Sequence, residues 1–317
     1  MENKLALIFT HKGSSDYLWY CLEQAKKTNP EARIILLGDE ANKPYDSSIE
    51  HYLISDYFEG ATKFESVYRH QSSNPYWYEL ICFQRWFIIN DFAQKNNIDM
   101  LYGCDTDIMI YDDLSKYIPQ VNFKLTIANK NGPQCSFFTK ESINDFCNYI
   151  IKQYTDPICV QRLLTRYRHF IDNKLPGGNC DMTMFEFCEQ DFPGSVLDYG
   201  FMEPVRKDSI KPMLYCCSSN YDWIKTEVLK KYFTIAQIRF QDNTPYILAK
   251  DGNKYFVPIV HFLGQYKQFM GEYSTIDKEK NDYIKKNYTI KRPFAKTKFF
   301  IKQCLPFGIV NLIKKNK

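Results

Sequence analysis

The first candidate for chemistry is a pair of aspartates, Asp105 and Asp107, at the end of an apolar run. They follow Met100-Leu-Tyr-Gly-Cys104 and precede Ile108-Met-Ile-Tyr111, so the pair is expected at the end of a buried strand. Two carboxylates in such a place are unfavourable unless a positive group faces them. Mg²⁺ and Mn²⁺ prefer oxygen ligands and often join carboxylates to the phosphates of a nucleotide. The pair therefore predicts a divalent cation that bridges to a phosphate.

A second candidate lies far downstream, in His261-Phe-Leu-Gly-Gln-Tyr-Lys267, directly after the apolar run 255–260. A histidine beside a strand is more often a core residue, but Gly264 and Lys267 follow it at short spacing. An imidazole can complete the coordination of a cation, and glycine lets the backbone approach a phosphate closely. A lysine at this point can neutralise a departing diphosphate. The three residues together favour a functional interpretation.

The elements that must position these residues begin at the N-terminus. Leu5–Thr10 and Arg33–Leu37 read as buried strands, and Ser14–Lys27 between them has the apolar spacing of a helix. A strand–helix–strand order predicts a parallel sheet, and ligands of such sheets lie beyond the carboxyl ends of the strands. Thr10 and His11 fall at that edge.

Later segments extend the α/β pattern. A weaker strand is expected at His51–Tyr57, a strong helix at Tyr76–Gln94, and a hairpin at Tyr246–Val260 around Asp251-Gly252-Asn253. The remaining expected elements are the strands Leu125–Ala128 and Cys135–Thr139 and the helices Lys140–Tyr154 and Met182–Glu189.

Composition narrows the class of protein. The chain has 317 residues, of which 44% are hydrophobic and 16% aromatic, which excludes a disordered or fibrous protein. The eleven cysteines contain no Cys-x-x-Cys pair, so reduced thiols in a cytosolic protein are expected rather than a disulfide framework or zinc site. We see no signal peptide and no apolar run long enough to span a bilayer. Neither a Gly-x-x-x-x-Gly-Lys phosphate loop nor a Gly-x-Ser-x-Gly elbow occurs.

The C-terminal segment differs in charge from the rest. Residues 291–317 contain eight Lys or Arg and no Asp or Glu, so subtracting eight from the net charge of +4 leaves about −4 for residues 1–290. Nucleic-acid binding by the main body is therefore not expected. Because lysines alternate with Phe, Ile and Leu in this segment, it is typical of an amphipathic segment on an anionic membrane. We expect a main domain at 1–275 and a membrane-associating segment at 276–317.

The two motifs resemble those of glycosyltransferases with the GT-A fold, a Rossmann-like nucleotide-binding sheet flanked by helices. Asp105-Thr106-Asp107 matches the Asp-x-Asp motif of that fold. His261, Gly264 and Lys267 resemble the His-x-x-Gly-x-x-Lys signature of the glycogenin and bacterial lipopolysaccharide galactosyltransferase-like families. The likeness covers about residues 4–270, and the tail resembles the membrane-attachment segments of bacterial surface-polysaccharide glycosyltransferases. Gln268-Phe269 stands where those families usually have Pro-Trp, which leaves the stereochemistry of transfer open.

The resemblance implies a role for each matching residue. Asp105 would contact the metal or the ribose, Asp107 and His261 would ligate Mn²⁺ or Mg²⁺, and Lys267 would bind the diphosphate. Thr10 and His11 would lie beside the nucleotide.

Three further features stay open at this level. Asp181 follows Gly177-Gly178 and is either an N-cap or first-turn residue of a helix, or a catalytic residue that binds sugar hydroxyls or acts as general base. For Arg85 a surface or core-edge place is the leading expectation, and contact with the donor phosphates is the alternative. Trp77 and Tyr78 are expected in the core, with stacking on an acceptor sugar as the alternative.

The expected activity is transfer of a sugar from a nucleotide diphosphate sugar, with a UDP-sugar as the leading donor, to a lipid-linked or surface-polysaccharide acceptor. The expected place is the inner face of the cytoplasmic membrane, by peripheral attachment. The alternatives are a sugar nucleotidyltransferase and a non-catalytic, membrane-bound sugar-binding subunit. The sequence does not fix the oligomeric state.

Overall fold

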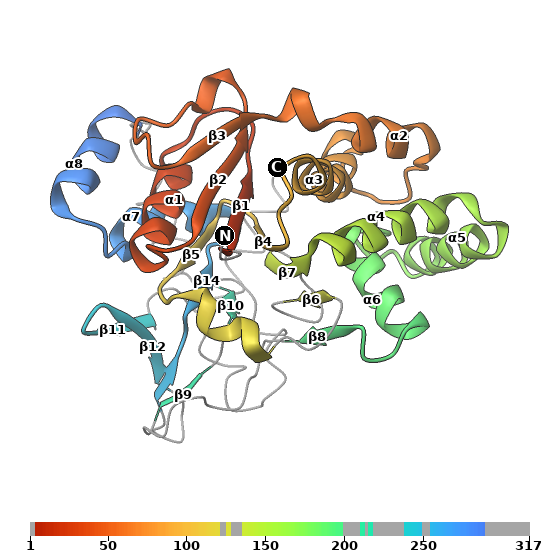
Figure 1. Cartoon of the computed structure of the whole chain (residues 1–317). Coiled ribbons are helices and arrows are strands. Elements are labelled where there is room, and N and C mark those ends of the chain that lie inside the picture. Colours follow the sequence, from red (N-terminus) through yellow and green to blue (C-terminus); the bar gives the residue numbers. More distant parts are fainter. Residues whose placement is uncertain are drawn as a thin grey trace, which may run out of the picture.

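The structure is a computed structural model that describes residues 4–120, 125–127, 135–198, 210–212, 215–217, 238–248 and 254–288. At its centre lies a seven-stranded sheet in the order β3-β2-β1-β4-β7-β6-β8 (Figure 1). The pairings among β3, β2, β1 and β4 are parallel, as is β6 with β8, whereas β7 runs antiparallel to both β4 and β6. The strands are β1 (Ala6–Thr10), β2 (Arg33–Gly38), β3 (Glu50–Leu53), β4 (Met100–Cys104), β6 (Leu125–Ile127), β7 (Cys135–Thr139) and β8 (Val196–Asp198).

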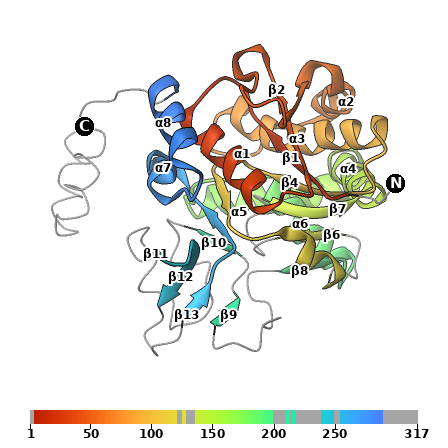
Figure 2. The same cartoon turned by 60° about the vertical axis from the view of Figure 1, so that its left-hand side comes forward.

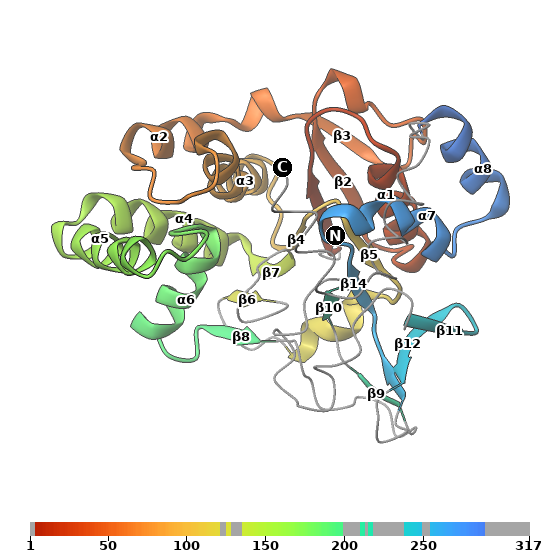
Figure 3. The same ribbon diagram turned by 180° about the vertical axis from the view of Figure 1, so that it is seen from behind.

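Helices cover both faces of this sheet (Figures 1 and 3). Successive residues of a strand point to opposite faces, so β1 sends Leu7 and Phe9 into one core and Ala6 and Ile8 into the other. The first core lies under α1, and the second lies under α2, α3 and α4. The helices are α1 (Asp16–Thr28), α2 (Glu59–Val67), α3 (Tyr76–Lys95), α4 (Lys140–Thr155), α5 (Pro157–Asp172), α6 (Asp181–Asp191), α7 (Met270–Tyr273) and α8 (Lys278–Asn287).

Two smaller sheets complete the described part of the chain. One has the order β10-β14-β5 and carries the second motif, and the other has the order β11-β12-β13-β9 and stands below the main sheet in Figure 2. Their strands are β5 (Ile108–Ile110), β9 (Ile210–Pro212), β10 (Tyr215–Cys217), β11 (Ile238–Gln241), β12 (Thr244–Leu248), β13 (Lys254–Phe256) and β14 (Ile259–His261). Short 3-10 helices are η1 (Glu40–Asn42), η2 (Ile54–Tyr57), η3 (Leu114–Gln120) and η5 (Gly264–Phe269).

The expected α/β class with a mostly parallel sheet flanked by helices is confirmed. The predicted strand–helix–strand start corresponds to β1, α1 and β2, and the predicted long helix to α3. The weaker strand is shorter than predicted, because β3 ends at Leu53 and η2 follows it. Of the predicted hairpin, β12 and β13 are antiparallel, whereas residues 259–261 belong to β14 in another sheet and the turn lies outside the described residues.

Helix α8, the last helix of the described residues, packs against α1. The ammonium group of Lys280 pairs with Glu23, a carboxylate with 1% exposure on α1, and with Asp46 at 3.2 Å. The ring of Tyr288 lies 4.9 Å from that of Trp19, centroid to centroid. The described part of the expected tail segment, residues 276–288, is thus fastened to the sheet domain, and residues 289–317 lie outside the description. Among the described residues, no helix combines the length and apolarity needed to cross a bilayer.

Candidate active site

A single cavity of about 770 Å³ lies where the carboxyl ends of β1 and β4 meet the loop after β14 and the helices α3 and α6. All the residues predicted to form a site line it. They are Thr10, His11, Arg85, Asp105, Asp107, Asp181, His261, Gly264 and Lys267. The convergence follows from the topology, because parallel strands bring their carboxyl ends to one edge of the sheet.

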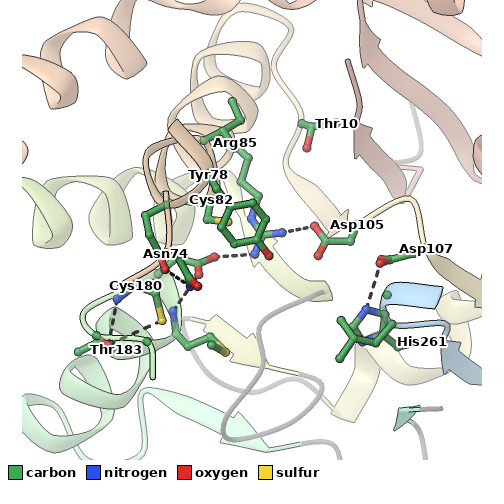
Figure 4. A pocket seen from close by; sticks show the side chains of 18 of the residues that line it. Thr10, Asn74, Tyr78, Cys82, Arg85, Asp105, Asp107, Cys180, Thr183 and His261 are labelled. Carbon is green, nitrogen blue, oxygen red and sulfur yellow. Dashed lines mark hydrogen bonds and ion pairs between the residues drawn. The ribbon is translucent and has the colours of Figure 1, made fainter. Parts of the chain in front are cut away.

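Asp107 and His261 meet because β14 pairs antiparallel with β5, which starts directly after Asp107. The Nε2 atom of His261 lies 3.3 Å from Oδ1 of Asp107, and the two side chains are almost wholly buried (Figure 4). Lys267, on η5, places its Nζ 2.9 Å from Oδ2 of the same carboxylate. We call Asp107, His261 and Lys267 the Lys267 side of the cavity.

The charges on the Lys267 side support one another. Burial by itself would raise the pKa of Asp107, but His261 and Lys267 outweigh that effect and hold this pKa well below its usual range. Burial would likewise lower the pKa of Lys267, whereas the net effect, led by Asp107, is to raise it. The carboxylate is therefore ionised and the lysine protonated at neutral pH. The Lys267 ammonium also lies 5.0 Å from the centre of the Tyr17 ring, within cation–π range.

Gly264 begins η5 with φ of +60°, a backbone conformation that favours glycine. A Cβ atom placed there would meet no atom within 4 Å. The glycine is therefore explained by the backbone turn that brings Lys267 back to the cavity, and not by crowding from the protein.

Asp105 has different partners, although a single residue separates it from Asp107. One terminal nitrogen of the Arg85 guanidinium contacts Asp105 (Figure 4). The other, Nη2, lies 2.5 Å from Oδ2 of Asp181. The indole Nε1 of Trp86 donates to the same Oδ2 at 3.1 Å. Burial raises the pKa of Asp105, and the positive charge of Arg85 opposes that rise. We call Arg85, Asp105 and Asp181 the Arg85 side of the cavity.

Asp181 is the first residue of α6, and the N-cap is Cys180. Its Oδ1 accepts the backbone N–H of Met182 at 3.0 Å, so the carboxylate lies at the helix end where negative charge is favourable. The preceding Gly178 approaches protein backbone, since a Cβ there would lie 2.2 Å from the carbonyl oxygen of Gln71. Gly178 is therefore required by packing against residues 71–72. Of the two structural interpretations of Asp181, the first-turn one is confirmed and the N-cap one is wrong.

The fit of the site to a divalent cation can be judged from its oxygen and nitrogen atoms. Oδ1 of Asp107 is buried and has no hydrogen-bond donor among the described residues, while an imidazole nitrogen lies 3.3 Å away. Such a carboxylate–imidazole pair suits Mn²⁺ or Mg²⁺. Asp105 is paired with Arg85, and within the described ranges no three acidic, histidine or cysteine side chains are gathered as a ready metal site. Two of the three predicted ligands are therefore close together, and the third has a competing partner.

His11 lies at the carboxyl-end edge of the sheet, as predicted, and lines the cavity. Its Nδ1 is 2.8 Å from the hydroxyl of Thr106, and its ring meets that of Tyr17 edge to face at 5.5 Å. Burial, assisted by the charge of Lys267, lowers the pKa of His11 to about 4. The imidazole is therefore neutral at physiological pH and offers hydrogen bonds without charge.

Arg85 and the α3 aromatics differ from their leading expectations. Arg85 is neither a surface nor a core-edge residue, because it stands in the cavity wall with two carboxylates. Trp77 and Tyr78 are not in the core: their exposures are 69% and 48%, and Tyr78 lines the cavity. Sequence reasoning did not single out Tyr17 or Trp86. Tyr17 lies in the first turn of α1, the helix that follows β1, and this position could have indicated that it lines the cavity. Nothing in the sequence near Trp86 indicates its contact with Asp181.

Comparison with known proteins gives a fold and no family. No protein-family profile and no curated protein sequence matches the chain. Its fold is similar to that of mouse xyloside xylosyltransferase 1 in its apo form, with a TM-score of 0.51, 11% identity, and coverage of 81% of this chain and 97% of that chain. The described sheet, with its parallel start and antiparallel β7, is thus a glycosyltransferase-like, GT-A-like fold.

Two more distant likenesses complete the comparison. The bifunctional glycosyltransferase WbbM, apo, gives a TM-score of 0.47 at 9% identity, over 90% of this chain and 52% of that chain. A glycosyltransferase involved in the glycosylation of the major capsid of PBCV-1 gives 0.39 at 11% identity, over 89% of this chain and 99% of that chain.

Proposed function

We propose that this protein is a metal-dependent glycosyltransferase that moves a sugar from a nucleotide diphosphate sugar, of the UDP-sugar class, to a lipid-linked or surface-polysaccharide acceptor. One observation carries the proposal. In a glycosyltransferase-like fold, a buried carboxylate–imidazole pair and a protonated lysine share a cavity with a second, separate carboxylate cluster.

The donor's diphosphate is assigned to the Lys267 side. Lys267 is protonated and faces the cavity, so it can form a charge-assisted hydrogen bond to a phosphate oxygen. The backbone turn at Gly264 leaves open space beside it, which suits a bulky anion. Thr10 and the neutral His11 offer hydrogen bonds to the base and ribose.

Asp105, Asp107 and His261 would hold Mn²⁺ or Mg²⁺. When bound, the cation neutralises negative charge that builds up on the departing nucleoside diphosphate. The unsatisfied Oδ1 of Asp107 supports this assignment, because a buried carboxylate oxygen without a donor is otherwise unfavourable.

The reaction breaks the bond between the anomeric carbon and the phosphate oxygen and forms a bond from that carbon to an acceptor hydroxyl oxygen. The hydroxyl proton is lost, and the nucleoside diphosphate leaves with the bonding electrons. Positive charge develops on the sugar ring in such reactions. Lys267 stabilises the leaving group, and Asp181, held by Arg85 and Trp86, is assigned to sugar hydroxyls or, in an inverting reaction, to the acceptor proton.

The basic tail is assigned to the anionic inner face of the cytoplasmic membrane, where it would bring the cavity to a lipid-linked acceptor. Deleting residues 291–317 should release the protein from anionic liposomes in a flotation assay. Unchanged flotation would remove the tail from the proposal and leave the sugar transfer untouched.

A thermal-shift panel of nucleotide sugars, each with and without Mn²⁺, tests the central proposal. A ligand that binds only the folded state raises the melting temperature by mass action, so the donor should raise it most and only with metal. The positive nucleotide sugar is then incubated with the enzyme, and free nucleoside diphosphate is measured. Release of pyrophosphate from a nucleoside triphosphate would indicate a nucleotidyltransferase instead. Binding without any donor turnover would indicate a sugar-binding subunit.

A further inference from the structure

A second hollow of about 620 Å³ lies on the outer side of α5 and α6, beside the active-site cavity. The two spaces have three lining residues in common, Arg166 and Phe170 of α5 and Glu186 of α6. The two hollows therefore adjoin at these residues, and the outer one extends along α5 as far as Ile158. We call the outer hollow the α5–α6 groove.

The walls of the groove combine an apolar ring surface with uncharged hydrogen-bonding groups. Phe170 contributes a partly exposed ring, and Gln161, Thr165 and Gln190 contribute amides and a hydroxyl. Phe187 also lines the groove, but its ring is buried beneath the Arg162 guanidinium. A pyranose has both an apolar ring face and a rim of hydroxyl groups. Aromatic faces and neutral donors and acceptors are the groups that match it.

The charges in the groove are already neutralised by the protein. The guanidinium of Arg162 lies 2.8 Å from Asp191 and stacks 3.6 Å from the centre of the Phe187 ring. Arg166 pairs with Glu186 at 3.1 Å. Because each arginine has a carboxylate partner, the groove floor has little net charge to attract phosphate or an anionic lipid surface. An uncharged, hydroxyl-rich ligand is the better match.

The build of α5 is unusual for a helix that only supports a domain. Of its residues only Leu163 is fully buried, while Ile158 at its outer end has an exposure of 81%. From Ile158 to Phe170 the helix advances about 18 Å, at the usual 1.5 Å per residue. The groove is thus longer than one sugar ring needs.

We infer that the α5–α6 groove binds the sugar units of the acceptor that lie beyond the one receiving the transferred sugar. The acceptor is then an oligosaccharide or polysaccharide chain, and not a monosaccharide or a bare lipid phosphate. The inference rests on the proposed glycosyl transfer, since it assigns the outer part of the acceptor of that reaction. Glycan length is recognised by α5 and α6, while the reacting hydroxyl is placed beside Asp181.

The test fills the groove without disturbing the core. Thr165→Trp and Gln161→Trp each place a bulky ring at an exposed position that lines the groove. Arg168→Trp is the matched control, because Arg168 is exposed on the same helix and lines neither hollow. Circular dichroism and melting temperature verify that all three full-length variants fold as the wild type does.

Fluorescently labelled proteins are applied to a printed panel of neutral glycans from one to eight sugar units and, separately, to vesicles of anionic phospholipid. We expect the wild type and Arg168→Trp to bind longer glycans at least tenfold more tightly than the corresponding monosaccharides, and both groove variants to lose that preference. Equal affinity for short and long glycans in the wild type, or wild-type glycan binding by both groove variants, would overturn the inference. The inference would also be overturned if the wild type bound the vesicles but no glycan, and if Thr165→Trp abolished that vesicle binding.

Hydrolysis of the donor by the wild type, in which water takes the place of the acceptor, is measured in parallel as free nucleoside diphosphate. If the wild type turns over a donor but shows no preference for longer glycans, the role of the α5–α6 groove is refuted, and the proposed glycosyltransferase activity is not. Absence of turnover with every nucleotide sugar refutes the proposed function itself.

Discussion

The two sides of the cavity contain the same kinds of groups and use them differently. On the Lys267 side, Asp107 is nearly buried and keeps one oxygen without a hydrogen-bond donor, while its positive partner also faces the open cavity. On the Arg85 side, a cation is held between two carboxylates, and Asp181 accepts three hydrogen bonds. The first arrangement can still take a ligand, whereas the second has largely satisfied itself. Asp105 and Asp107, two residues apart in sequence, thus differ in availability: Asp107 keeps one oxygen for a ligand, whereas Asp105 must exchange its contact with Arg85 to reach one.

The strongest way to break this comparison is Asp107→Asn. We expect kcat/KM for sugar transfer to fall by about 10³-fold, in the range seen when a preorganised electrostatic group is removed from an active site. Steady-state kinetics with the donor found by thermal shift gives the measurement, and the melting temperature verifies folding. Full activity of the variant, or full activity of the wild type in EDTA, would refute the role of Asp107 in metal binding.

Arg85→Met should lower the free energy of unfolding. It leaves Asp105 and Asp181 in the cavity wall without their shared cation, and breaking a buried ion pair in this way costs about 3 kcal/mol or more. Urea unfolding followed by fluorescence measures the change. Arg85→Lys, which keeps the charge but not the two-pronged contact, should lose less. A methionine variant as stable as the wild type would show that the Arg85 side is not a structural frame.

Lys267→Met tests whether the Lys267 side of the cavity binds phosphate. Loss of one charge-assisted contact to phosphate should weaken nucleoside diphosphate binding about tenfold, which corresponds to about 1.4 kcal/mol. Isothermal titration calorimetry with the product nucleotide gives the affinity. Lys12→Met is the control, since Lys12 is an exposed lysine of the loop after β1 and does not line the cavity. Equal effects of the two variants would mean that only general positive charge matters.

The smallest effect on stability is expected at Arg33 and Glu50, a partly exposed ion pair between β2 and β3. This pair serves as a reference for the buried ion pairs of Arg85. Hydrogen bonding to Arg33 lowers the pKa of Glu50. A lowered folded-state pKa stabilises the protein above the unfolded value, near 4.5, and this contribution is lost as the pH falls through the folded value. Solvent screening limits it to about 0.5 kcal/mol. Glu50→Gln should therefore be slightly less stable at pH 7 and equal to the wild type at pH 2. A constant difference at both pH values would contradict this origin.

Much of the architecture was accessible from local patterns. The apolar runs at β1, β2 and β4 are short and uninterrupted, and the rule that ligands gather at their carboxyl ends was enough to predict that Thr10 and Asp105 share a cavity. The position of His261 could also be inferred, because a strand precedes it and a glycine and a lysine follow at short spacing.

The parts that escaped prediction depend on distant contacts or on ambiguous patterns. Arg85 and Asp181 are 96 positions apart, and nothing near either residue reveals that they pair. Tyr76, Trp77 and Tyr78 occupy three successive directions around α3, about 100° apart, so apolarity could not show which of them faces water. Helix α5 was not predicted, although Asp156 as N-cap followed by Pro157 at the first helical position is a start signal that the sequence offers.

The contacts of Lys280 with Glu23 and of Tyr288 with Trp19, which we call the α8–α1 clamp, determine where the chain can be truncated without exposing the core. A truncation that ends before Lys280 would uncover the Trp19 indole and strand the Glu23 carboxylate inside the protein without its counter-charge. Such a shortened protein should aggregate for reasons unrelated to membranes. A cut after Tyr288 keeps the clamp whole, so only trimming beyond that point reports on what the remaining segment does.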